Sequence, residues 1–164
     1  MDVHFRTPVV SGTHFKRGSY DLRRSPAATL PVTCFMLSQT MSRIVLIIED
    51  DESCAETLLI AIAAVPGLEP RAVPSIRAAL EAFEQQPNEI AAVVTDLHFP
   101  ESNGLELIRH LRSEPRYATV PILLVSGDSD PRLPERALSV GANAFFCKLY
   151  SLCAVQEKLE QLLS

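Results

Sequence analysis

Three acidic side chains stand directly behind two short apolar runs of the chain. Glu49 and Asp50 follow the first run, and Asp96 follows the second. Carboxylates crowded at one place repel one another, and their pKa values rise unless a cation joins them. Mg²⁺ prefers oxygen ligands and commonly takes one or two carboxylates together with phosphate oxygens. If both runs end at one point in space, the sequence predicts a Mg²⁺ site made by these three acids.

Two further polar residues follow later apolar runs and extend this chemistry. Ser126 offers a hydroxyl group, and Lys148 offers a compact positive charge that a phosphate could use. A carboxylate nucleophile, a metal ion, a hydroxyl and a lysine together form a phosphoryl-transfer site. Asp96 is the expected nucleophile, because its strand is central and the most buried. The plainer alternatives are solvated loop acids, a serine that only ends its strand, and a lysine in a structural salt bridge.

The runs that precede these residues have the length and composition of buried strands. They are short, apolar and rich in β-branched residues, which is typical of strands covered on both faces. A weaker strand at residues 68–73 contains Pro70, which cannot donate to a strand ladder and therefore predicts an edge strand. The strands expected to be buried cover residues 43–48, 90–95, 120–125 and 144–147.

Segments with apolar residues at helical spacing separate the expected strands. The pattern is a strand followed by a helix, repeated five times. Such alternation predicts a parallel five-stranded sheet with helices on both faces and right-handed crossovers. With the Pro70 strand at the edge, the strand order becomes 2-1-3-4-5, the flavodoxin-like order. Its switch point, where ligands bind, lies between the first and third strands.

Charge and composition exclude several classes of function. From residue 43 onward, ten Lys and Arg face eighteen Asp and Glu, so direct nucleic-acid binding is not expected. No apolar run approaches the roughly 20 residues that span a bilayer, so membrane insertion is not expected either. The four cysteines lack metal-binding spacing and are expected to be reduced thiols of a cytoplasmic protein: Cys34, Cys54, Cys147 and Cys153.

Residues 1–42 differ from the rest of the chain. They carry three prolines, many Ser and Thr residues and scattered Arg, without helical or strand periodicity. This composition predicts a disordered leader, with a transit peptide as a second interpretation. Met41 precedes the first strand by two residues and offers a second start, in which case residues 1–40 would not be translated in the native protein. The folded domain is expected to cover residues 43–164.

The polar residues at the strand ends resemble those of the receiver domain of two-component response regulators. The resemblance covers residues 43–164 and combines motifs that would each be weak alone. Glu49 and Asp50 match the family's acidic pair, and Asp96 matches its phosphoacceptor aspartate, followed by a hydrophobic-Pro-x-x-x-Gly loop with Phe99, Pro100 and Gly104. Ser126 with Gly127 matches the hydroxyl residue and its small neighbour. Phe145 matches the switch aromatic, and Lys148 matches the lysine.

The resemblance implies reversible phosphorylation of Asp96 by a histidine kinase or a histidine phosphotransferase, with Mg²⁺ required. It implies that the backbone carbonyl of His98 joins the three carboxylates as a metal ligand. It also implies phosphorylation from a small phosphodonor and slow autodephosphorylation. Ser126 would be drawn to the phosphoryl group, Phe145 would rotate inward, and the altered surface would signal to a downstream protein. Because the sequence ends at Ser164, a single-domain regulator is expected.

Three departures from the family pattern affect this expectation. Leu149 stands where proline usually follows the lysine, so a trans peptide bond and a change in the loop or in Lys148 placement are expected. Phe145 lacks the phenolic hydroxyl of the commoner tyrosine, so a switch through it would use packing alone. Phe99 replaces the usual methionine. Two alternatives are open for the side chains of His98 and Asp128. Each is either a solvated loop residue or a group that affects how fast water reaches the acyl phosphate on Asp96.

Other functions remain as alternatives. A degenerate receiver would bind partners without being phosphorylated, and the Leu149 departure favours it. A Mg²⁺-dependent phosphatase with an aspartyl-phosphate intermediate would carry its nucleophile after the first strand, whereas Asp96 follows the third. A nucleotide-binding enzyme of the Rossmann type would need a glycine-rich turn after the first strand, where this chain is acidic.

Overall fold

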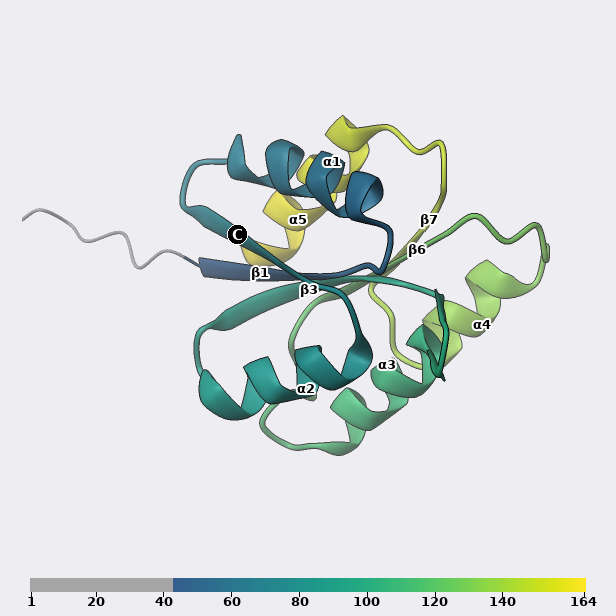
Figure 1. Cartoon of the computed structure of the whole chain (residues 1–164), viewed down its shortest axis with the longest axis horizontal. Coiled ribbons are helices and arrows are strands. Elements are labelled where there is room, and N and C mark those ends of the chain that lie inside the picture. The colour runs from purple at the N-terminus through teal and green to yellow at the C-terminus, as the bar shows by residue number, and fades with distance from the viewer. Residues whose placement is uncertain (1–42) are drawn as a thin grey trace, which may run out of the picture. The chain divides into compact units, whose positions relative to one another are not determined.

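A computed structural model describes residues 43–164, which form a three-layered unit with one sheet in the middle (Figure 1). The expectations for the leader at residues 1–42, for a start at Met41 and for Cys34 fall outside these residues. Within residues 43–164 the cysteines are free thiols. No helix in this range is long and apolar enough to cross a membrane.

The sheet has five parallel strands in the order β2-β1-β3-β6-β7, which confirms the predicted flavodoxin-like order. The numbering differs from the expected 2-1-3-4-5 only because two short strands lie between β3 and β6. As the position of Pro70 predicted, β2 is an edge strand. The strands are β1 (Arg43–Ile48), β2 (Leu68–Val73), β3 (Ile90–Asp96), β6 (Ile122–Ser126) and β7 (Ala144–Cys147).

Helices cover both faces of the sheet, with α1 and α5 on one face and α2, α3 and α4 on the other (Figure 1). Side chains cap three of them as helix-forming sequences require: Asp51 accepts a hydrogen bond from the Cys54 amide, and Ser75 and Asn103 do the same at α2 and α3. The helices are α1 (Glu52–Ala63), α2 (Ile76–Gln85), α3 (Gly104–Ser113), α4 (Leu133–Ser139) and α5 (Leu152–Leu163).

Alternate residues of the central strands supply two separate cores. In β1, Val45 and Ile47 pack with the helices α1 and α5, whereas Leu46 and Ile48 pack with residues of α2 and α3. Because both faces are covered, almost every side chain of β1, β3 and β6 is buried. The carboxyl ends of these strands are therefore held rigidly, and so are the polar residues that stand there.

The structure differs from the sequence-based expectation in one additional hairpin and at two element boundaries. The loop after Asp96 contains a small antiparallel hairpin, β4 (His98–Phe99) with β5 (Ser102–Asn103), which was not predicted. Strand β6 begins at Ile122 rather than Val120, because Pro121 has no amide to donate. The sequence indicates Pro134 as the first residue of the next helix, because proline suits the first helical position, but helix α4 begins one residue earlier, at Leu133.

Candidate functional site

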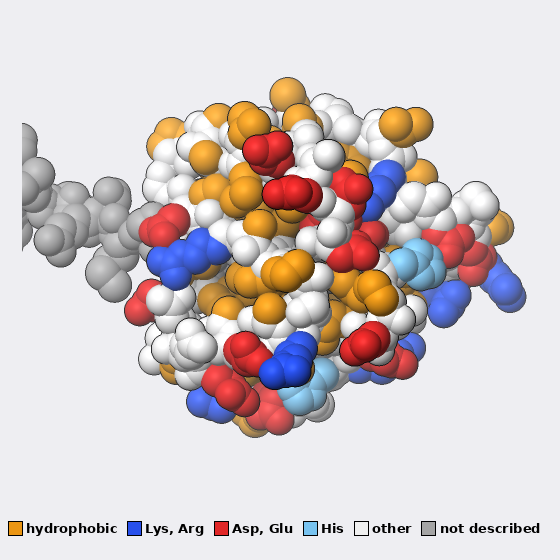
Figure 2. Space-filling view, viewed as in Figure 1, with side chains coloured by type: hydrophobic (Ala, Val, Ile, Leu, Met, Phe, Trp, Pro, Cys, Tyr) orange, Lys and Arg blue, Asp and Glu red, His pale blue; other side chains and the backbone are white. Residues whose placement is uncertain are grey.

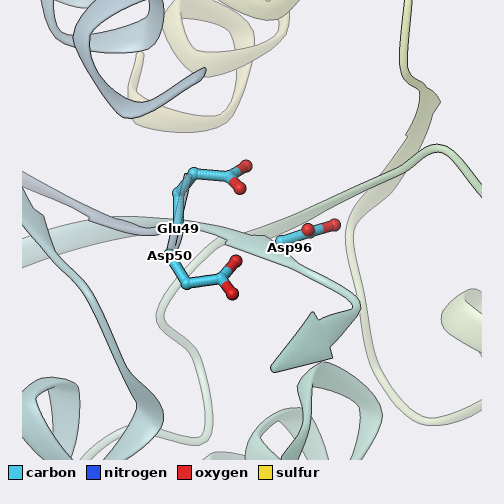
Figure 3. Close-up of side chains that lie close together, drawn as sticks. All are labelled: Glu49, Asp50 and Asp96. Atoms are coloured by element: carbon cyan, nitrogen blue, oxygen red, sulfur yellow. The ribbon is translucent and has the colours of Figure 1, made fainter. Parts of the chain in front are cut away.

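Three carboxylates meet at the carboxyl end of the sheet, between the adjacent strands β1 and β3. Ile48 pairs with Thr95 in the parallel register, so the next residues, Glu49 and Asp96, are neighbours across the two strands. Glu49 and Asp50 reach from the end of β1 toward Asp96 (Figure 3). One oxygen from each of the three side chains lies within 4.8 Å of the others. Acidic side chains gather at this end of the sheet on the surface as well (Figure 2).

Lys148 supplies the positive charge that this acidic cluster needs. Its ammonium Nζ lies 3.0 Å from Asp96 Oδ2, 3.2 Å from Glu49 Oε1 and 3.1 Å from Glu49 Oε2. The residue follows β7, and its backbone amide donates to the carbonyl of Ser126 at 2.6 Å, which ties it to the end of β6. Lys148 therefore reaches the carboxylates from the far side of β6, as the sheet order predicted.

Burial and charge act in opposite directions on the site. Burial raises the pKa of Glu49, and the charge of Asp96 adds to this, while the hydrogen bond from Lys148 opposes it. Burial alone would lower the pKa of Lys148, but its hydrogen bonds to Asp96 and Glu49 and the charges of these two carboxylates together raise it. The lysine is therefore a permanent cation, and Glu49, only 3% exposed, is the carboxylate that most lacks solvent.

The donor set fits a hard divalent cation. Glu49 Oε2 is buried and accepts no hydrogen bond, because Lys148 lies near it but outside hydrogen-bonding geometry. In an octahedral Mg²⁺ site with bonds of about 2.1 Å, ligand oxygens lie about 3.0 to 4.2 Å apart. The separations between the three carboxylates come close to that range. Glu49, Asp50 and Asp96 could therefore hold Mg²⁺ together with water and a phosphoryl oxygen.

The backbone around Asp96 fixes the direction of its carboxylate. Oδ1 accepts a hydrogen bond from the Leu97 amide at 2.7 Å, while Oδ2 faces Lys148. The hydroxyl of Thr95 donates to the Asp96 carbonyl at 2.9 Å. Gly104 packs so closely behind this carbonyl that a Cβ atom there would lie 2.2 Å from its oxygen. The chain between Asp96 and Gly104, which contains the β4–β5 hairpin, is therefore a tight loop with both of its ends held beside the carboxylates.

The remaining predicted site residues lie around the carboxylates rather than among them. Ser126 is fully buried at the end of β6, and its hydroxyl oxygen accepts from the Asp128 amide at 3.0 Å. No hydrogen bond joins Ser126 to a carboxylate of the acidic cluster within residues 43–164. The exposed side chain of His98 contacts Asp128, with 3.2 Å between Nε2 and Oδ2. Phe145 is half-buried and packs against the core that contains Leu133 of α4.

Two features of the site were missed by sequence reasoning. The contact between His98 and Asp128 joins residues 30 positions apart, which no local pattern signals. Leu149 adopts a left-handed backbone conformation, with φ of 79°, and its side chain is fully exposed. Within residues 43–164 all peptide bonds are trans, as expected where leucine replaces proline. The changed residue is thus accommodated by the loop shape, and Lys148 still reaches Asp96.

Comparison with known proteins identifies relatives of this chain. A family model described as the response regulator receiver domain matches residues 45–160. A chemotaxis protein CheY homolog of Campylobacter jejuni (strain 81-176) is 33% identical over 75 residues, which cover 46% of this chain and 58% of that protein. The two-component response regulator ORR11 of Oryza sativa subsp. indica is 28% identical over 99 residues, or 60% of this chain and 67% of that protein. The first match thus spans less than two thirds of its relative.

Solved structures give the same fold over most of the described residues. The signal receiver domain of a signal transduction histidine kinase from Syntrophus aciditrophicus matches with a TM-score of 0.66 and 28% identity, covering 74% of this chain and 89% of that one. A response regulator receiver protein from Pseudomonas putida matches with a TM-score of 0.65 and 25% identity, covering 73% of this chain and 96% of that one.

Proposed function

The chain belongs to the response regulator receiver domain family, and we propose that Asp96 accepts a phosphoryl group from a partner protein. The partner is a histidine kinase or a histidine phosphotransferase. The observation that carries the proposal is the placement of Asp96, whose carboxylate ends β3 beside Lys148 and faces the carboxylates of Glu49 and Asp50.

In the proposed step, an oxygen of the Asp96 carboxylate attacks the phosphorus atom of a phosphohistidine. An O–P bond forms, the N–P bond breaks, and the leaving imidazole nitrogen keeps the electron pair. The Leu97 amide holds the carboxylate in position for attack. Lys148 donates to Asp96 beforehand and then donates to a phosphoryl oxygen, which stabilises the charge on the transferred group.

Mg²⁺ bound at the acidic cluster would neutralise charge on the phosphoryl oxygens. Glu49, Asp50 and Asp96 would hold it through their carboxylates, and His98 through its backbone carbonyl. The exposed Asp50 is the ligand that has no ion pair with Lys148, so its carboxylate is free to take the metal without displacing the lysine. The buried Oε2 of Glu49, which accepts no hydrogen bond, would gain a partner in such a cation, and this supports a requirement for the metal.

The output of the domain is a change of shape that a downstream protein recognises. The Ser126 hydroxyl turns toward the phosphoryl group and Phe145 moves inward against the core, so that the surface around α4 is altered. Physically this is a shift of population between two packings, biased by the hydrogen bonds of the phosphoryl group.

One observation favours a second function, a receiver that binds its partner without phosphorylation. Leu149 takes a left-handed backbone conformation directly after Lys148, where the family usually has proline. The contacts of Lys148 with Asp96 and Glu49 favour the first function, a receiver that is phosphorylated.

Intact-mass spectrometry separates the two functions. The protein is incubated with acetyl phosphate and Mg²⁺, and the expected gain is the mass of one phosphoryl group. Asp96→Asn should abolish this gain, and EDTA should prevent it. The matched control is Glu101→Gln, which neutralises an exposed acid of the nearby hairpin and should be phosphorylated normally. An unchanged wild-type mass would favour the unphosphorylated binding module.

A further inference from the structure

Asp128 connects the two loops that flank Asp96. Its backbone amide donates to the hydroxyl oxygen of Ser126 at 3.0 Å. One oxygen of its carboxylate, Oδ2, lies 3.2 Å from Nε2 of His98, which belongs to the hairpin after β3. Its other oxygen, Oδ1, accepts from the Asp130 amide at 2.9 Å. A single residue therefore contacts the predicted switch hydroxyl, the hairpin after the phosphoacceptor and the loop that leads to α4.

The contacts continue in steps of two residues to the beginning of α4. Asp130 Oδ1 accepts from the Arg132 amide at 2.9 Å, and the Asp130 carbonyl accepts from the Leu133 amide at 3.0 Å. Asp130 Oδ2 also accepts from Arg136, one turn into the helix, at 3.3 Å. We call the side-chain-to-amide bonds of Ser126, Asp128 and Asp130 the 126–132 ladder. It spans the whole distance from the buried end of β6 to α4.

The main chain of Ser126 is fixed, so only its side chain can respond to a phosphoryl group. Ser126 pairs with Cys147 of β7, and its carbonyl accepts from the Lys148 amide. The hydroxyl accepts from Asp128, which leaves its own proton to donate to another oxygen. If the side chain turns toward Asp96, the Asp128 amide loses its acceptor unless it follows. The amide is tied in turn to the ladder, so a rotation at Ser126 displaces the segment before α4.

Helix α4 can transmit such a displacement because it begins in the core. Leu133, the first residue of α4, is 1% exposed and packs in the same cluster as Phe145. The N-cap residue Arg132 provides no side-chain cap for α4, and its own amide donates to Asp130 Oδ1, so the ladder reaches the first turn of the helix. Phe145 has no hydroxyl and cannot take part in a switch made of hydrogen bonds. The 126–132 ladder consists of hydrogen bonds alone.

We propose that Asp128 is a positioning residue that orients the Ser126 hydroxyl and passes its movement through the 126–132 ladder to α4. The inference rests on the proposed phosphorylation of Asp96 and adds the route by which the domain signals. His98 contributes by holding the Asp128 carboxylate from the side of the hairpin.

The test compares NMR spectra of the ¹⁵N-labelled protein with and without beryllium trifluoride and Mg²⁺, which mimic a phosphoryl group on an aspartate. In the wild type, amide shifts are expected at Leu97 next to the phosphoacceptor, at Asp128, and at Leu133 and Ala137 in α4. Asp128→Ala should keep the Leu97 shift and lose the α4 shifts. Asp128→Asn retains a side-chain oxygen that can accept from the Asp130 amide, so it should restore them.

The controls separate the ladder from general damage to the fold. Glu135→Ala removes an exposed carboxylate of α4 outside the ladder and should leave all shifts as in the wild type. Full α4 shifts in Asp128→Ala, or their loss in Asp128→Asn, would overturn the proposal, as would an unchanged Asp128 amide in the wild type. Absence of any shift at Leu97 in the wild type would instead overturn the proposed phosphorylation, and the ladder with it. If Asp128→Ala does not fold, Asp130→Ala interrupts the ladder one step later and must also lose the α4 shifts.

Discussion

Replacement of Gly104 by alanine should lower the stability of the domain and disturb the proposed phosphoacceptor, Asp96. The new Cβ atom would lie 2.2 Å from the Asp96 carbonyl oxygen, 3.2 Å from its carbon and 3.2 Å from Cδ1 of Leu124. Contacts of a Cβ atom below 3.0 Å hardly occur, so the carbonyl or Gly104 must move by at least 0.8 Å, the difference between 3.0 and 2.2 Å. The obstacle is backbone of the central strand, which cannot rotate away as a side chain would.

We expect Gly104→Ala to lower the free energy of unfolding by about 3 kcal/mol, the upper end for insertion of a methyl group into a packed site. Urea denaturation followed by circular dichroism measures this, with the slope m as a check that the unfolded state is unchanged. Phosphorylation by acetyl phosphate should also slow, because the Asp96 carboxylate moves with its backbone.

Gly127→Ala is the matched control for this prediction. A Cβ atom there meets only the Cβ and Cδ atoms of Lys148, both at 3.7 Å, which is an ordinary contact distance. This variant should remain within about 0.5 kcal/mol of the wild type. Equal stability of the two alanine variants would contradict this expectation, since the tight approach of Gly104 to Asp96 would then have no energetic consequence.

Three further substitutions test other parts of the structure. Leu149→Gly should raise the free energy of unfolding, measured with urea, by about 0.5 to 1 kcal/mol, because glycine adopts the left-handed conformation without strain and no packing is lost. Leu149→Pro should lower the free energy of unfolding by more than about 1 kcal/mol, since proline cannot reach a φ of 79°. Burial raises the pKa of Glu49 above its ordinary value of 4.5, so the folded state holds this proton more tightly than the unfolded state does. In EDTA, the free energy of unfolding of the wild type should therefore fall as the pH rises from 4.5 through the pKa of the folded state. Glu49→Gln should remove this fall. Arg112 donates to the carbonyls of Gly141 and Val120, so Arg112→Met should cost about 2 kcal/mol in urea, and Arg109→Met, on the exposed side of the same helix, should cost little.

The sheet was predictable because its strands are buried on both faces. The run of residues 44–48 has no polar position to accommodate, so its composition alone marks a central strand. Pro70 marked the edge, and the alternation of strands and helices then left few topologies. The hairpin β4–β5 was not predictable, because strands of two residues are too short to show a period. The start of β6 was placed early because its apolar run extends over Pro121, which lacks the amide that pairing requires.

The meeting of the acidic residues with Lys148 was predictable, but the individual contacts around them were not. The rule that parallel strands share one edge brought Glu49, Asp96 and Lys148 together without any knowledge of distances. The same rule cannot say that Ser126 binds the Asp128 amide, since that depends on the path of a loop. Leu149 illustrates a further limit, because leucine as a residue type does not favour the left-handed backbone that it adopts here, with φ of 79°.

The chemical position of the phosphoryl group tests the central claim most directly. After incubation with acetyl phosphate and Mg²⁺, borohydride reduces an acyl phosphate to the corresponding alcohol, and tandem mass spectrometry of the digested protein locates that residue. The alcohol is expected at position 96 and at no other acidic residue. Reduction at Glu49 or Asp50, or recovery of every acidic side chain unchanged, would contradict it.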